Sequence, residues 1–301
     1  MTWLLAAVLS YLFLAMAVLI DKYILAGPLS SPKVYAFYVG MFGGFALILI
    51  PFGFAVIPEA SLILLALLAG FFRTFAIVFL FTAIKNSEAS RVVPAIGGLI
   101  PLFTFGLAFI LSKGKDMLSV SEASAFIFFI LGTVLITLKK EKFITLQSLK
   151  ISAAAALFFA SSFVLSKFVY LQQSFVSGFI WIMLGAFLAA LLLILSKEVR
   201  GEIFQKKEIL KRKTAFTFLF NQTLGAAGFI LQNWAIVLVP LSLLSFVFAL
   251  EGVRYVFILI FAVFLSLKFP KILKEEISKG IILQKILAIL LIGGGLALLA
   301  L

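Results

Sequence analysis

Long apolar segments recur from one end of this chain to the other, and each is long enough to cross a lipid bilayer. A transmembrane α-helix needs about 20 mostly apolar residues to span a hydrocarbon core of about 30 Å. The segments lack the alternation of apolar and polar residues that marks the strands of a membrane β-barrel. The sequence therefore predicts an all-α membrane protein with ten transmembrane helices, at residues 3–20, 34–52, 61–84, 91–112, 121–138, 149–170, 175–195, 214–238, 241–267 and 281–300.

Composition agrees with a membrane protein and excludes several kinds of chemistry. Apolar residues make up 64% of the 301 residues and charged residues 12%, against about 25% charged in soluble domains. The net charge of +13 comes from Lys and Arg between the apolar segments, which indicates topology and contact with anionic lipid rather than nucleic acid. The chain has no Cys and no His, so we expect no metal, haem or other cofactor.

The basic residues also predict orientation. Of the 25 Lys and Arg, Lys113 and Lys115 fall clearly on one side of the membrane, and Arg73, Lys167 and Arg254 fall inside apolar segments. The other 20 fall on the opposite side, which the positive-inside rule makes cytoplasmic. We therefore expect a multi-pass protein of the plasma or inner membrane. Both termini should lie outside the cytoplasm, and the charged loop 197–213 within it.

The second half of the sequence echoes the first. Residues 20–25, around Asp21 and Lys22, match 165–170 around Lys167, and Ala83-Ile84 matches Ala235-Ile236. Each half holds five predicted spans, and an odd number forces the two copies into opposite orientations. The sequence predicts an inverted repeat, with residues 1–143 as the first unit and 144–301 as the second.

Four short motifs occur in order within this arrangement: Ser90-Arg91-Val92-Val93-Pro94, Ile100-Pro101-Leu102-Phe103-Thr104, Asp116-Met117-Leu118-Ser119 and, in the second half, Glu275-Glu276-Ile277-Ser278. Over nearly the whole chain, this pattern resembles the EamA family of the drug/metabolite transporter superfamily. The resemblance implies a ten-helix carrier that works by alternating access, with a central site between two EamA repeats. Many family members keep both termini in the cytoplasm, whereas the charges here predict the reverse. The family also gives no role for the polar insertion Glu251-Gly252-Val253-Arg254.

Charged residues near the middle of a span are the first candidates for a binding site, because each costs about 2.5–3.5 kcal/mol to insert. Arg73 lies in the third span, and Glu251 and Arg254 share one face of the ninth. The alternative for the last two is a neutralised pair that only packs. Lys167 either lines the cavity or extends to the headgroups, and Lys22 is predicted to extend to them beside Asp21.

Polar and helix-breaking residues supply further candidates. The amides of Gln222 and Asn233 share a face of the eighth span, where they either join helices or contact a polar substrate. The fourth span carries candidate hinge residues, which instead could serve only packing: Pro94, Gly97, Gly98 and Pro101. Trp181 and Tyr255 are predicted to be core or interface aromatics.

These residues favour a secondary carrier of a small polar, anionic or zwitterionic metabolite. The positive excess of the central charges indicates the anionic class, and no Walker loop is present to bind ATP. Protons are a candidate coupling ion, through Glu251. The alternatives are a flippase for a lipid-linked substrate and an intramembrane enzyme. The second is disfavoured because adjacent Ser166 and Lys167 point about 100° apart and cannot form a dyad.

Overall fold

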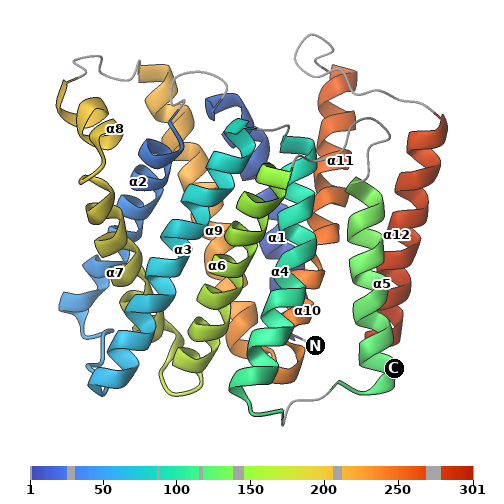
Figure 1. Ribbon diagram of the computed structural model, residues 1–301, viewed down its shortest axis with the longest axis horizontal. Helices are drawn as coiled ribbons and strands as arrows, with labels where there is room; N and C mark the ends of the chain where they lie inside the picture. The colour runs from blue at the N-terminus through green and yellow to red at the C-terminus, as the bar shows by residue number, and fades with distance from the viewer. Residues whose placement is uncertain are drawn as a thin grey trace.

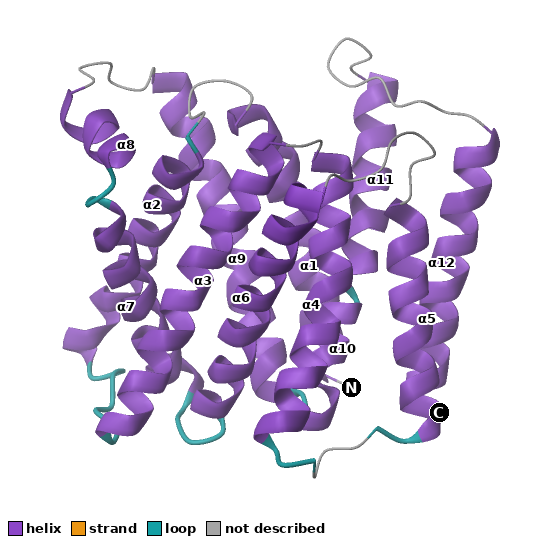
Figure 2. Cartoon of the chain, in the orientation of Figure 1, coloured by secondary structure: helices purple, strands orange, loops and turns teal. Residues whose placement is uncertain are grey.

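The computed structural model describes residues 2–25, 31–86, 89–114, 118–137, 146–205, 212–268 and 279–300. Within these ranges the chain is helical and has no strand (Figure 2). The elements are α1 (Thr2–Leu25), α2 (Pro32–Gly43), the 3₁₀ segment η1 (Gly44–Phe52), α3 (Ala60–Asn86), α4 (Ala89–Leu111), α5 (Val120–Thr137), α6 (Leu146–Tyr170), α7 (Phe175–Leu193), α8 (Lys197–Arg200), the π-helical turn η2 (Gly201–Gln205), α9 (Arg212–Leu238), the 3₁₀ turn η3 (Leu241–Leu243), α10 (Leu244–Ala249), α11 (Glu251–Lys268) and α12 (Lys279–Ala300).

The prediction of an all-α membrane protein is confirmed at this level. Among the described residues, six segments are long and apolar enough to cross a membrane: Thr2–Asp21, Pro32–Phe52, Ala60–Ala83, Leu146–Tyr170, Phe175–Leu193 and Leu241–Ile258. Two shorter apolar helices, Ala95–Leu111 and Val120–Leu135, lie within α4 and α5. Many large apolar side chains are exposed on the bundle, Ile57, Val120 and Leu195 among them, as lipid-facing surfaces require.

Two predicted spans are not uniform α-helices. The second span is α-helical only to Gly43 and continues as the 3₁₀ segment η1, which contains Pro51. The ninth span is divided into η3, α10 and α11, with an interruption at Leu250. The fourth span, which carries the candidate hinge residues, is one continuous helix, α4. Part of the 197–213 loop is also ordered, as α8 and η2.

The helices pack as a bundle in which segments far apart in the chain are neighbours. α3 packs against α6 and α7, while α1 packs against α9 and α11. α4 packs against α6, and α5 pairs with α12 at one end of the bundle (Figure 1). α2 pairs with α7 at the other end, beside α8.

Small residues set the closest approach, between α3 and α7. A Cβ atom built on Gly70 would lie 2.0 Å from the carbonyl oxygen of Ile182, and one on Gly185 would lie 2.3 Å from that of Leu67. Thr74 strengthens the contact, since its hydroxyl donates to the carbonyl of Ala186 over 3.1 Å. Without side chains at the crossing the two backbones touch, as small residues permit in membrane helix pairs.

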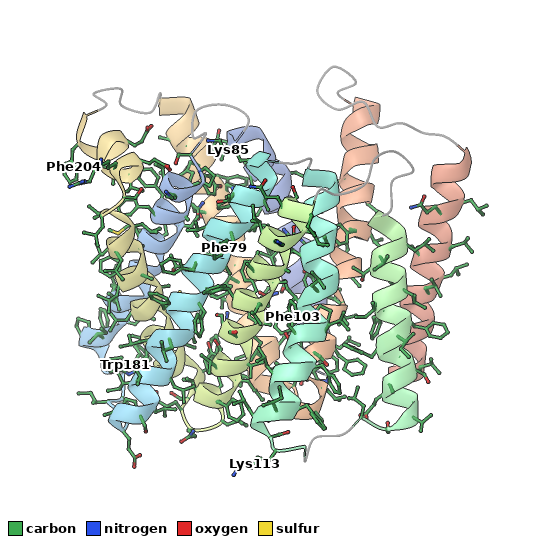
Figure 3. All side chains as sticks on the ribbon, in the orientation of Figure 1. Phe79, Lys85, Phe103, Lys113, Trp181 and Phe204 are labelled. Carbon is green, nitrogen blue, oxygen red and sulfur yellow. The ribbon has the colours of Figure 1, made fainter. Side chains whose placement is uncertain are left out.

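Four labelled side chains mark the two ends of the bundle. Lys85 lies near the upper end of α3 and Phe204 near α8 at the same level, whereas Lys113 lies below α4 and Trp181 near the lower end of α7 (Figure 3). α1 begins and α12 ends in the lower half of the bundle (Figure 1). At the lower end the indole nitrogen of Trp181 donates to the carbonyl of Val56 over 3.0 Å, so Trp181 fastens the segment after η1.

Candidate functional site

Arg73 lies at the middle of α3 with its guanidinium over an aromatic ring of α9. Its Cζ atom is 3.9 Å from the centroid of Phe229, a cation–π distance. Among the described residues, Arg73 forms no ion pair and no hydrogen bond with protein. A guanidinium has five N–H donors, and the Phe229 ring does not offer them the acceptor that an oxygen atom would. The side chain is partly exposed although it lies mid-helix.

Space remains open on the α9 face that leads to Phe229. A Cβ atom built on Gly225, one turn before Phe229, would meet no atom within 4 Å. Gly228, on another face, is by contrast packed against Leu14 of α1, with only 2.8 Å to its Cγ atom. The open face of α9 therefore carries Gly225 and Phe229 and reaches Arg73.

Glu251 and Arg254 lie where the ninth span is interrupted. α10 ends at Ala249, α11 begins at Glu251, and the hydroxyl of Thr133 in α5 approaches the Ala249 carbonyl at 3.4 Å. The Nη1 atom of Arg254 donates to Oε1 of Glu251 over 2.7 Å, and their side chains are 19% and 11% exposed. The carboxylate also begins helix α11, where the helix dipole stabilises negative charge. The two charges therefore neutralise each other at a broken helix.

Two donors beside this ion pair are left without acceptors. The Nε atom of Arg254 and the hydroxyl of Tyr255 are buried and have no hydrogen-bond partner in the described part of the chain. Buried donors are almost always satisfied, by protein or by a bound molecule, because an unmade bond costs about 1–3 kcal/mol. Gly97 of α4 makes the approach possible, since its Cβ would lie 3.0 Å from Cγ of Glu251 and 3.1 Å from the Tyr255 hydroxyl.

Tyr11 joins α1 to the same region. Its hydroxyl donates to the carbonyl of Val247 in α10 over 2.7 Å, and its side chain is fully buried. The bond satisfies a carbonyl of the short helix that ends just before the interruption.

The hinge candidates of the fourth span are placed only in part. Gly97 faces the ion pair, and a Cβ atom on Gly98 would lie 3.7 Å from Cγ2 of Val134 in α5. Both therefore serve the packing of α4 against its neighbours. The side chain of Pro94 lies outside the described residues, as do that of Lys22 and the segment Glu275–Ser278.

Lys167 has a packing role that the sequence did not predict. It is 3% exposed, and its ammonium donates to the carbonyls of Val237 at 3.0 Å and Val239 at 2.5 Å. These carbonyls end α9, where a helix carries unsatisfied acceptors and partial negative charge. Lys167 is therefore buried, with its ammonium bound to backbone carbonyls at the end of α9.

Asn233 also joins helices. Its Oδ1 accepts from the Tyr170 hydroxyl at 2.9 Å, and its Nδ2 donates to the carbonyl of Phe229 at 2.9 Å. The residue is 1% exposed. Gln222, predicted to share its role, lies elsewhere, beside the hydroxyl of Tyr35 near the other end of α9.

Replacing Lys167 by Met distinguishes a role in packing from a role in solute binding. The substitution keeps most of the side-chain length but leaves the carbonyls of Val237 and Val239, at the end of α9, without this donor, so the free energy of unfolding should fall by about 1–3 kcal/mol. Thermal unfolding of the purified protein measures the effect, and Lys150→Met, on the exposed surface of α6, is the matched control. A Lys167→Met protein that melts like the wild type but no longer binds its solute would contradict the packing role.

A second polar cluster near the upper end of α1 was not predicted as a site. Asp21 accepts hydrogen bonds at Oδ1 from the Tyr35 hydroxyl of α2 and from Nδ2 of Asn221 in α9, the latter over 2.6 Å. Phe218, one turn before Asn221, packs edge-on against Tyr35, Tyr38 and Phe42. The sequence signal was the acidic residue inside the final turns of an apolar helix, but it was attributed to the headgroup region.

No protein-family model matches this sequence, and no functionally curated protein matches it. The structure, however, is similar to a protein crystal structure over 100% of this chain and 98% of that chain, with a TM-score of 0.70 and 16% sequence identity. A similarity of this kind shows a shared fold over the full length of both chains. It carries no information on substrate.

Proposed function

We propose that this chain is a secondary carrier that moves a small anionic or zwitterionic metabolite across the membrane by alternating access. The observation that carries the proposal is Arg73, a guanidinium in the middle of a membrane helix without an acceptor in the described protein. Charged side chains at this depth face a cavity or a partner, because lipid does not solvate them. An anionic group of the solute is the partner that would satisfy several donors at once.

The buried donors at Arg254 Nε and Tyr255 support the same solute chemistry. Hydrogen-bond donors without acceptors favour a ligand rich in acceptor atoms, such as a carboxylate or phosphate. Glu251 holds Arg254 in place and would repel an anion that approached closely, so a zwitterion with a positive group on that side also fits. We propose that Arg73, Arg254 and Glu251 border one central cavity, with Gly97 allowing α4 to approach it.

We further propose ten spans in two inverted repeats of the EamA type, residues 1–143 and 144–301. The packing supports this pairing if α1, α2, α3, α4 and α5 correspond to α6, α7, α9, α10–α11 and α12. Exchanging the halves turns the α1–α9 contact into α6–α3 and α4–α6 into α11–α1, and both members of each pair occur. The contacts α2–α7 and α5–α12 map onto themselves.

The contact between α3 and α7 differs from the corresponding contact between α9 and α2, and this difference suits alternating access. α3 and α7 touch through the backbones at Gly70 and Gly185, whereas the corresponding helices α9 and α2 meet through the rings of Phe218, Tyr38 and Phe42. A carrier with inverted repeats closes one side with one repeat and opens the other with its counterpart. We propose that the α3–α7 contact is the tightly closed, extracytoplasmic side.

Orientation is tested by cysteine labelling, because the native chain has no cysteine. A membrane-impermeant maleimide should label Glu59→Cys in intact cells and Phe204→Cys only after lysis. Both residues are exposed, Phe204 at 73%, so accessibility within the protein does not limit the reaction. Labelling with the opposite pattern would place the termini in the cytoplasm.

Ligand-dependent thermal stabilisation of the purified protein tests the solute class. Anionic, zwitterionic, neutral and cationic metabolites of similar size are compared at equal concentration. A ligand at about 100 times its Kd stabilises the native state by about 2.7 kcal/mol, so a matching anion should raise the melting temperature clearly. Stabilisation by cations alone, or equally in Arg73→Ala, would contradict the assignment.

A further inference from the structure

The cluster of Asp21, Tyr35 and Asn221 joins three helices with one carboxyl group. Asp21 lies on α1, Tyr35 on α2 and Asn221 on α9, and both partners donate to the same oxygen, Oδ1. Tyr35 is 1% exposed and Asn221 2%, whereas Asp21 itself is partly exposed. Among the described residues Asp21 forms no ion pair. Within the described side chains, this carboxyl group therefore lies against a buried tyrosine and a buried amide without a contacting cation.

The hydrogen-bond inventory of the cluster lacks a donor. Oδ1 of Asn221 is buried and has no partner in the described part of the chain, although Nδ2 of the same amide donates to Asp21. An ionised carboxylate offers acceptors only, whereas a protonated one gains an O–H donor. A proton on Asp21 therefore supplies the kind of group that the Asn221 oxygen lacks. Without that proton the cluster has one donor fewer, while the carboxylate and the buried Asn221 oxygen are both acceptors, which is unfavourable.

The side chains that donate hydrogen bonds to Asp21 are Tyr35 of α2 and Asn221 of α9. Gln222 of α9 lies beside Tyr35 and Tyr38 of α2 beside Phe218, and the carboxyl group of Glu202 in η2 acts on Tyr38. From α11, the charge of Arg254 acts on Asp21 at longer range. Arg254 is already paired with Glu251, so its net field at Asp21 is small. The carboxyl group of Asp21 is the acidic member of this cluster, so its charge changes when it gains or loses a proton.

The cluster lies at the place where α2 and α9 meet. Asn221 is one turn from Phe218, whose ring packs against Tyr35, Tyr38 and Phe42, and one turn from Gly225, where open space begins. Phe218, Asn221 and Gly225 follow the 3–4 spacing that places residues on one face of a helix. Beyond them on this face comes Phe229, under Arg73. The rings and the Asp21 cluster therefore close the route along α9 to Arg73.

We propose that Asp21 is a proton-binding site that couples proton binding to this closure, an inference that rests on the proposed carrier function. With a proton on Asp21 the three helices are held together and the α2–α9 gate, defined by Phe218, Tyr35, Tyr38 and Phe42, is closed. When the proton leaves to solvent, the carboxyl group changes from neutral to negative. It then draws in water and separates α9 from α2. The coupled ion is a proton, and Asp21 rather than Glu251 carries it.

The test measures access past the gate and needs no substrate. Gly225→Cys places a thiol in open space just behind the gate, and Leu195→Cys, 76% exposed at the end of α7, is the control. The maleimide rate at Gly225→Cys is divided by the rate at Leu195→Cys at each pH, because thiolate formation itself depends on pH. In detergent-solubilised protein this ratio should rise about tenfold as pH increases, which corresponds to about 1.4 kcal/mol. With Asp21→Asn, whose amide supplies a permanent donor, the ratio should stay low at every pH.

Further results test the proposal even if the Asp21→Asn protein does not fold. Asn221→Asp sets a second carboxyl group against the first, so the midpoint of the labelling curve should move to higher pH. An unmoved midpoint, or a ratio independent of pH with Asp21 intact, would overturn the proposal. So would a ratio that responds to Na⁺ at constant pH, since the site would then bind a metal cation. None of these outcomes depends on Arg73 binding an anion, so the carrier function and the proton site can fail separately.

Discussion

Replacing Arg73 by Ala should abolish solute transport while leaving the amount and melting temperature of the folded protein close to wild type. We expect transport to be lost without a loss of stability because of the contacts that Arg73 makes. Its guanidinium has one aromatic contact with Phe229 and no hydrogen bond or ion pair in the described structure. A cation–π contact of this kind contributes about 0.5–2 kcal/mol, and removing a partly buried charge regains part of that. Stability should therefore change little.

Arg73→Lys should retain part of the activity. Lysine keeps the positive charge but offers a point charge instead of a planar fork that binds two oxygens together. Uptake of radiolabelled solute into vesicles, divided by the amount of folded carrier, measures both variants. Lys85→Ala, which removes an exposed cation near the end of the same helix, is the control and should transport normally. Wild-type transport by Arg73→Ala would remove Arg73 from the site.

Replacing Gly70 by Ala should prevent accumulation of folded protein. The added Cβ would lie 2.0 Å from the Ile182 carbonyl oxygen and 2.4 Å from the Ala186 nitrogen, and both are backbone atoms of α7. No rotation of a side chain relieves such a clash, so α3 and α7 must separate and lose the Thr74 bond to Ala186. Overpacking in a core costs about 1–3 kcal/mol and more where backbone must move. Gly185→Ala should act the same way, with 2.3 Å to Leu67.

Gly106→Ala in α4 is the matched control, since its Cβ would meet no atom within 4 Å. Alanine favours a helix over glycine by up to about 1 kcal/mol, so this variant should be as stable as the wild type or more so. Size-exclusion chromatography and thermal unfolding of the variants provide the comparison. A Gly70→Ala protein that elutes and melts like Gly106→Ala would mean that α3 and α7 are not in backbone contact.

The sequence predicts the helical membrane class well because that class depends on local properties. An apolar run of about 20 residues must be helical in a bilayer, whatever its neighbours, since every backbone polar group needs a partner. The same reasoning marks Arg73, Glu251 and Arg254, whose cost in lipid is visible from position alone. The i, i+3 spacing of the last two also anticipated their contact, at 2.7 Å in the structure.

The sequence was less informative where the result depends on which helices are neighbours. The ammonium of Lys167 finds the carbonyls that end α9, 70 and 72 residues away, and no local pattern indicates that bond. Asp21 and Asn221 are 200 residues apart, and each alone reads as an interfacial polar residue. The sequence marked the prolines of the fourth span as candidate hinge residues but gave no sign of the interruption before Glu251. There Thr133 of α5 and Tyr11 of α1 satisfy carbonyls of α10.

Solute uptake by the purified protein in liposomes tests the central claim most directly. Vesicles are loaded with an unlabelled anionic metabolite, and entry of the labelled form is followed without ATP. The account predicts accumulation above that of protein-free vesicles for at least one carboxylate or phosphate compound, competition by other anions, and loss of the signal with Arg73→Ala. Uptake of cations but of no anion, or anion uptake that Arg73→Ala leaves intact, would contradict it.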